Sequence, residues 1–103
     1  MKPSHTYFVY MVLCDDGSYY VGVTNDADRR VEEHNAGSDP NAYTFTRRPV
    51  RLVYSQQFNE VDDAIRSEKQ IKGWSRKKKA ALVRGDWNAI VAMAREIRPP
   101  KST

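Results

Sequence analysis

Two runs of strand-forming residues lie on either side of a tight turn near the start of the chain, and together they predict a β-hairpin. The first run, residues 7–13, carries apolar side chains on both faces, which is typical of a central strand. Residues 15–17 (Asp-Asp-Gly) supply the turn, because Asp and Gly tolerate the left-handed backbone of tight turns. The second run, residues 18–23, returns along the first. Tyr10 and Tyr20 are therefore expected to lie close together.

The remainder of the chain predicts one more strand and four helices. Thr24 or Asn25 caps a helix that extends to about residue 35, and a loop over residues 38–48 leads to a strand over 50–55. Three helical segments follow, over about 61–72, 76–84 and 86–98, and Pro99-Pro100 ends the last one. The expected fold is an α+β domain with a small three-stranded antiparallel sheet flanked by helices.

The length and composition allow one ordinary globular domain. A chain of 103 residues buries enough surface for one hydrophobic core, so we expect a single domain over residues 1–103, with its core at about 7–84 and a final helix at about 86–98. No apolar run approaches the ~20 residues of a membrane-spanning helix, and the N-terminus lacks the apolar segment of a secretion signal. Cys14 is the single cysteine. These features predict a cytoplasmic protein without membrane contact.

The charges are unevenly distributed along the sequence. The net charge is only +4, yet residues 15–39 hold seven acidic and two basic side chains. Residues 66–84 hold eight basic side chains and a single acidic one, Glu68. A basic stretch of this kind attracts polyanions, most commonly nucleic acid, although a solvated helix surface is the ordinary alternative.

Five polar side chains form a pattern that suits phosphodiester hydrolysis. Tyr10 and Tyr20 are neighbours in the hairpin, while Arg30 and His34 are four residues apart and share a helix face. Glu68 interrupts an apolar helical stripe, which is costly unless a partner or a cation compensates. Arginine stabilises phosphoryl oxygens, His or Tyr can accept a proton from water, and a carboxylate suits Mg²⁺.

The same residues resemble the GIY-YIG nuclease superfamily. Phe8-Val9-Tyr10 and Tyr20-Val21-Gly22 stand where that family has its two motifs, and residues 24–35 are similar to its first helix. Residues 46–49 (Thr-Arg-Arg-Pro) and 68–78 are most similar to small bacterial YhbQ-like members, which are related to Slx-type nucleases. The first motif departs from the family pattern, because Phe8 and Val9 replace its glycine and isoleucine.

The resemblance implies a divalent-metal-dependent endonuclease that hydrolyses DNA, with branched or damaged forms and DNA repair as candidate contexts. It implies that Mg²⁺ or Mn²⁺ binds at Glu68 and that Gly22 allows close backbone approach. The implied catalytic residues are Tyr10, Tyr20, Arg30 and His34. The residues expected to contact nucleic acid are Arg47, Arg48, Lys72, Arg76, Lys77 and Lys78.

Two other functions remain open at the level of sequence. The asparagine found in larger family members has no counterpart that we can place, which favours a non-catalytic or partner-dependent nucleic-acid-binding module. An adaptor that binds a repair protein through the last helix is a weaker alternative. Glu68 also has an ordinary structural explanation, because Lys72 lies four residues later and can form an ion pair with it.

Overall fold

A computed structural model describes residues 6–97 and the side chains of residues 6–93. The chain forms two compact units, one ending at Gly73 and the other beginning at Trp74. The first unit contains the sheet and two helices, and the second contains two further helices. The fold is α+β, as the sequence predicts, and the single domain expected over the whole chain stays a prediction.

The sheet has three antiparallel strands in the order β2-β1-β3. β1 (Tyr7–Leu13) is central, and the hairpin to β2 (Tyr19–Thr24) confirms the turn expected at residues 15–17. β3 (Arg51–Phe58) pairs with the other edge of β1 and extends beyond the expected end at residue 55. It continues because its last residue still pairs with Tyr7 at the start of β1.

Helix α1 (Ala27–Ala36) follows the hairpin, and its first turn differs from the expected one. The N-cap is Asp26, whose Oδ1 accepts from the Arg29 amide at 3.0 Å. Thr24 cannot take that place because it ends β2, where its hydroxyl accepts from the Asp26 amide at 3.1 Å. Gly37 ends the helix with φ at 70°, which glycine adopts without strain.

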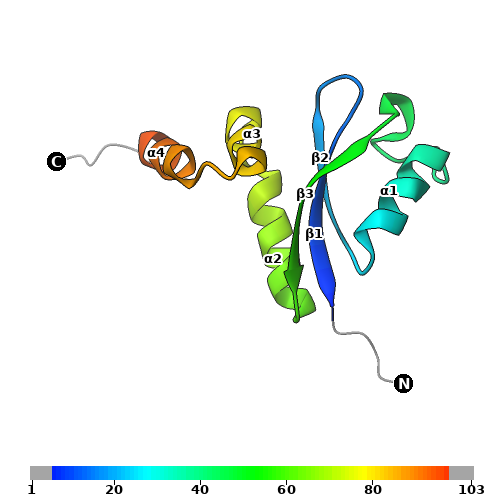
Figure 1. Cartoon of the computed structure of the whole chain (residues 1–103), viewed down its shortest axis with the longest axis horizontal. Helices are drawn as coiled ribbons and strands as arrows, with labels where there is room; N and C mark the ends of the chain where they lie inside the picture. The colour runs from blue at the N-terminus through cyan, green and yellow to red at the C-terminus, as the bar shows by residue number, and fades with distance from the viewer. Residues whose placement is uncertain (1–5, 98–103) are drawn as a thin grey trace. The chain divides into compact units, whose positions relative to one another are not determined.

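The two helices of the first unit cover opposite faces of the sheet (Figure 1). On the α1 face, the fully buried side chains of Tyr10 and Val12 pack with Cys14 and Val50. Side chains point alternately to the two faces of a strand, so the buried Val9 and Met11 face α2 (Val61–Lys72). Because both faces of β1 are buried, its sequence is a continuous run of apolar residues rather than an alternation of apolar and polar ones.

The segment between α1 and β3 is more ordered than the loop expected over residues 38–48. It contains a short 3-10 helix, η1 (Phe45–Arg47), which the sequence analysis missed. The Asn35 amide group ties the end of α1 to the start of β3, because Oδ1 accepts from the Val50 amide at 2.7 Å and Nδ2 donates to the Val50 carbonyl at 2.8 Å. The segment is therefore fixed at both ends.

The second unit begins with α3 (Arg76–Arg84), which Ser75 caps as predicted. Asp86 caps α4 (Trp87–Ile97) by accepting from the Ala89 amide at 3.0 Å. The stop expected at Pro99-Pro100 lies outside the described residues. Among the helices of residues 6–97, none combines the length and the apolar character needed to cross a bilayer.

Candidate active site

Tyr10 reaches the site across the backbone of its partner strand. It pairs with Gly22 in the β1–β2 register, and a Cβ at position 22 would lie 2.7 Å from the Tyr10 hydroxyl oxygen. Gly22 is thus required by the close passage of the phenol ring. Tyr20 pairs with Val12 and lies diagonally from Tyr10 on the same face, with 6.3 Å between the ring centroids. The tyrosines are neighbours as expected from sequence, although they are not directly opposite.

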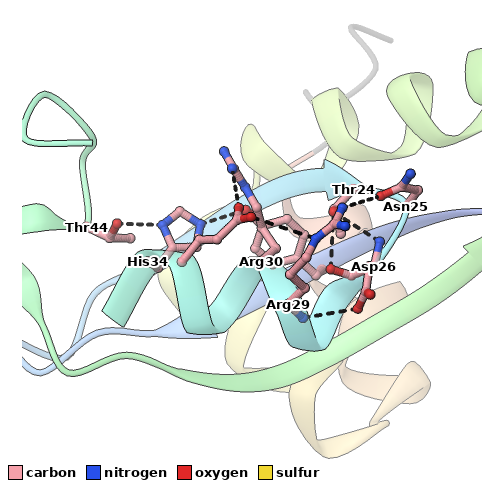
Figure 2. A network of polar contacts seen from close by, with 9 residues as sticks. Thr24, Asn25, Asp26, Arg29, Arg30, His34 and Thr44 are labelled. Atoms are coloured by element: carbon pink, nitrogen blue, oxygen red, sulfur yellow. Dashed lines mark hydrogen bonds and ion pairs between the residues drawn. The ribbon is translucent and has the colours of Figure 1, made fainter. Parts of the chain in front are cut away.

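A buried chain of three side chains runs from β1 through α1 to the segment before η1. The Tyr10 hydroxyl lies 2.8 Å from His34 Nε2, and His34 Nδ1 lies 2.7 Å from Thr44 Oγ1. Figure 2 shows the His34 ring with Thr44 at one of its nitrogens and with Arg30 one helical turn away. Tyr10 and Thr44 are each 1% exposed and His34 is 8% exposed, so all three side chains are shielded from bulk water.

Arg30 lies between this buried chain and solvent. Its Nη1 donates to Glu33 Oε1 at 3.0 Å. The Tyr10 hydroxyl is the largest cause of the raised pKa of the guanidinium, and Glu33 is the next. Glu33 additionally pairs with Arg29 at 3.7 Å. Arg30, the cation that the sequence analysis expects at the phosphate, is therefore accessible, and in the free protein its charge is paired with the Glu33 carboxylate.

Burial sets the protonation of the inner residues. Burial raises the pKa of Tyr10, and Arg30 opposes this in part, so the phenol is protonated at neutral pH. Burial and then the positive charge of Arg30 lower the pKa of His34 below its usual 6.5, against the smaller opposite effect of Glu33. His34 is therefore a neutral imidazole at pH 7.

A pocket of about 150 Å³ opens beside this arrangement. The Tyr20 ring forms one wall and stands edge-on to the His34 ring, with 5.3 Å between the centroids. The remaining polar side chains that line it come from α1 and the following segment: Arg30, Glu33, His34, Ser38, Asp39, Tyr43 and Thr44. A guanidinium, a phenol and a neutral imidazole around one open pocket can bind an oxyanion and orient a water molecule.

A stack of side chains supports the outer wall of the pocket. The Tyr43 ring stacks on Tyr20 with 5.9 Å between centroids, and the Arg47 guanidinium lies 3.8 Å from the centroid of Tyr43. Arg47 also pairs with Asp16 of the hairpin turn at 3.1 Å. The stack thus links the hairpin turn to the segment that carries Thr44.

Glu68 belongs to α2, which covers the other face of the sheet and also contacts β2. Its side chain is 13% exposed, and Oε2 lies 2.7 Å from Lys72 Nζ. This hydrogen bond is the largest cause of the raised pKa of Lys72, and burial opposes it in part. Glu68 does not line the pocket that Tyr20, Arg30 and His34 share.

The donor set suits only a lightly coordinated cation. Within the described residues, no group of three or more His, Cys, Asp or Glu side chains could hold a metal ion. A single carboxylate still fits Mg²⁺ or Mn²⁺ when waters and substrate phosphates supply the other ligands. Glu68 is the carboxylate in question, and Lys72 would have to release it.

The basic residues expected to contact nucleic acid have different surroundings. Arg47 and Arg48 donate to backbone carbonyls of Tyr43 and Phe45 at 2.7 and 2.8 Å, so they hold the segment around η1 together. Lys72, Arg76 and Lys77 are exposed. Lys78 differs from its expected place on the basic surface: it is 8% exposed, and its ammonium lies 4.3 Å from the centroid of the Trp74 ring.

Sequence reasoning missed two residues of the site. Thr44 and Tyr43 come from a segment without periodicity, in which neither residue carries a catalytic spacing signal. The available signal was the tract at residues 46–49, which matches the family and begins two residues after Thr44. Their contacts to His34 and Tyr20 depend on the path of the chain, which local pattern does not encode.

Comparison with known proteins agrees with this architecture. The sequence model of the GIY-YIG catalytic domain matches residues 6–81. A curated relative from Staphylococcus aureus, named UPF0213 protein, is 43% identical over 79 residues, which cover 77% of this chain and 95% of the relative. The solution NMR structure of the UPF0213 protein BH0048 from Bacillus halodurans is 42% identical with a TM-score of 0.50, covering 76% of this chain and 82% of that one. The solution NMR structure of the protein EF2693 from E. faecalis is 33% identical with a TM-score of 0.56, and the match covers 82% of this chain and 90% of that one.

Proposed function

The chain belongs to the GIY-YIG domain family, and on this premise we propose that it is an endonuclease that hydrolyses phosphodiester bonds in DNA. The observation that carries the proposal is the pocket in which Tyr20, Arg30 and His34 meet. Each group suits one need of the reaction: a cation for the phosphate, a phenol that orients the water, and a neutral imidazole that holds the Tyr10 hydroxyl in place.

We assign the roles according to access. Arg30 is exposed to the pocket, so it binds the scissile phosphate after leaving Glu33. Tyr20 forms the wall and orients the attacking water. Both ring nitrogens of His34 are engaged in hydrogen bonds, and Tyr10 is buried and protonated. We therefore assign these two residues a positioning role: they hold the side chains behind Arg30 in place.

Glu68 is the residue that would hold Mg²⁺ or Mn²⁺ together with substrate phosphates. A divalent cation at this position supplies charge neutralisation for the phosphate and the leaving oxygen. The protein's own contribution is to keep the carboxylate largely buried and paired with Lys72 at 2.7 Å in the free protein.

The choice of DNA as substrate rests on the basic residues outside the pocket. Lys72, Arg76 and Lys77 are exposed cations of the kind that contact the phosphates of nucleic acids. Cleavage of branched or damaged DNA during repair in the cytoplasm, with a partner protein supplying specificity, is the finer form of the proposal.

Cleavage of flap, junction, duplex and single-stranded DNA with and without Mg²⁺ or Mn²⁺ tests the proposal. We expect Arg30→Ala to lower the cleavage rate by about 10²–10³-fold, as loss of a transition-state cation does, and Glu68→Gln to abolish metal-dependent cleavage. Matched controls are Arg29→Ala and Glu32→Gln, which change exposed α1 residues outside the pocket lining. Cleavage that survives Arg30→Ala unchanged would refute this assignment.

The Glu68–Lys72 ion pair favours a second candidate, a non-catalytic nucleic-acid-binding module. In such a module the carboxylate is permanently neutralised by Lys72 and needs no cation. DNA binding without metal-dependent cleavage on any of these substrates would support the module and overturn the endonuclease.

A further inference from the structure

We propose that Thr44 is a positioning residue that fixes the tautomer of His34, with the ring hydrogen on Nδ1. The catalytic meaning of this proposal rests on the proposed nuclease function, but the tautomer is a property of the free protein. The direct evidence is the buried contact of 2.7 Å between Thr44 Oγ1 and His34 Nδ1. Thr44 lies outside every recognised motif of the chain and contacts the site through this histidine.

The number of hydrogens makes the tautomer a definite question. A protonated Tyr10, a neutral His34 and Thr44 carry one polar hydrogen each, and only two hydrogen bonds join the three side chains. One terminal hydroxyl must therefore direct its hydrogen outside the chain. If His34 carries its hydrogen on Nε2, the Tyr10 hydroxyl is the one that directs its hydrogen outside the chain. If His34 carries its hydrogen on Nδ1, the Thr44 hydroxyl does so.

The surroundings of the two ends are different. Burial raises the pKa of the Tyr10 hydroxyl and the Arg30 guanidinium opposes this in part, the phenol is fully buried, and Tyr10 is absent from the pocket lining. Among the described residues, His34 Nε2 is the hydrogen-bond partner of the Tyr10 hydroxyl at 2.8 Å, and a buried hydroxyl hydrogen directed away from it would be unfavourable unless it found another acceptor. The Thr44 side chain is also only 1% exposed, but it lines the pocket, where a water molecule inside the pocket can accept its hydrogen.

The hydrogen bonds therefore run in one direction. Tyr10 donates to Nε2, Nδ1 donates to Thr44, and the Thr44 hydroxyl donates into the pocket. In this arrangement Thr44 fixes both the orientation of the ring and the availability of the Nε2 lone pair to Tyr10. The Arg47 and Arg48 hydrogen bonds to Tyr43 and Phe45 hold the backbone on both sides of Thr44 in place.

Nitrogen NMR of the full-length protein, labelled at histidine and free of substrate, tests the tautomer directly. Loss of one ring signal in His34→Gln assigns His34 and separates it from His5. We expect wild type to show a protonated Nδ1 and an unprotonated Nε2 at neutral pH. Thr44→Ser keeps the acceptor and should keep that pattern, whereas Thr44→Val has the same shape without it and should give a mixture of both tautomers.

Thr46→Val is the matched control, since it makes the same change at an exposed residue two positions away. Backbone amide spectra establish that each variant is folded. A wild-type His34 protonated on Nε2, or a folded Thr44→Val with the wild-type tautomer, would overturn the proposal.

Cleavage assays then separate this inference from the proposed function. We expect Thr44→Val to lower the cleavage rate roughly 10- to 100-fold, as a misplaced catalytic group does, and Thr44→Ser to restore most of it. A wild-type protein with the expected tautomer and no cleavage would refute the nuclease and leave the assignment of Thr44 intact.

Discussion

At the scale of single residues, the site is organised by burial as much as by the chemistry of its side chains. Tyr10 matches a family motif, yet its pKa is raised and its ring is covered by β2, so it acts as a hydrogen-bond donor to His34. Tyr20 has the same chemistry and forms the open wall of the pocket. The sequence predicts both tyrosines but does not distinguish them, because the difference arises from the diagonal register of β1 and β2.

The lowered pKa of His34 predicts a specific dependence of stability on pH. In the unfolded chain His34 titrates near 6.5, whereas burial and Arg30 keep its folded pKa lower. Between these two values the unfolded state binds more protons, so the free energy of unfolding rises with pH there. The contribution of His34 is therefore complete above pH 6.5 and is lost as the pH falls through the folded value.

Urea denaturation of wild type and His34→Gln at several pH values from neutral downward measures this contribution. We expect the difference in unfolding free energy between the two proteins to shrink as the pH falls below 6.5. His5→Gln, which leaves His34 in place, serves as the control. A difference that stays constant or grows toward acidic pH would contradict the lowered pKa.

At the scale of elements, turns and caps are the features that local sequence predicts best. The hairpin turn, the Ser75 cap and the glycine that ends α1 all appear as expected, because each depends on one or two residues whose backbone preference is strong. The short helix η1 was missed, since it is held by long-range contacts such as the hydrogen bond from the Asp15 amide to the Arg47 carbonyl at 2.9 Å.

The pairing of Tyr10 with Gly22 predicts that Gly22→Ala is destabilising. The added Cβ would lie 2.7 to 2.8 Å from the hydroxyl oxygen and ring carbons of Tyr10, which is fully buried and cannot move aside freely. We expect a loss of about 1–3 kcal/mol in the free energy of unfolding, as for other overpacked cores, together with a weakened Tyr10–His34 contact.

Gly73→Ala is the matched control for this change. Its Cβ would lie 3.6 Å from the nearest atom, an ordinary contact, and its φ of −82° is open to alanine. Chemical denaturation should therefore show a change within about 0.5 kcal/mol for this variant. Equal losses in the two variants would mean that the phenol ring does not constrain position 22.

At the scale of the whole molecule, the sequence predicts where charged residues lie along the chain better than it predicts which of their side chains are exposed to solvent. The acidic stretch and the basic stretch are visible in the sequence, but nothing in the run at residues 76–79 indicates which lysine turns inward. Lys78 does so because Trp74, four residues earlier, provides an indole face for its ammonium. The site shows the same limit, since residues from β1, β2, α1 and the segment before η1 converge through the topology of the chain.

The contrast between Lys77 and Lys78 gives a test of how the protein binds DNA. Each cation that contacts a phosphate releases counterions, so removing it flattens the slope of log affinity against log salt by about 0.9. Lys77 is exposed, and Lys77→Gln should produce this change in binding to duplex DNA, with little effect on stability.

Lys78→Gln should have the opposite profile. Its ammonium is buried over Trp74, so we expect an unchanged salt slope and a loss of about 1 kcal/mol in the free energy of unfolding. Fluorescence anisotropy over a series of salt concentrations, paired with urea denaturation, measures both quantities on the same samples. If Lys78→Gln flattens the slope as much as Lys77→Gln, then Lys78 leaves the indole to contact phosphate, and DNA binding involves a rearrangement of α3 that the free protein does not show.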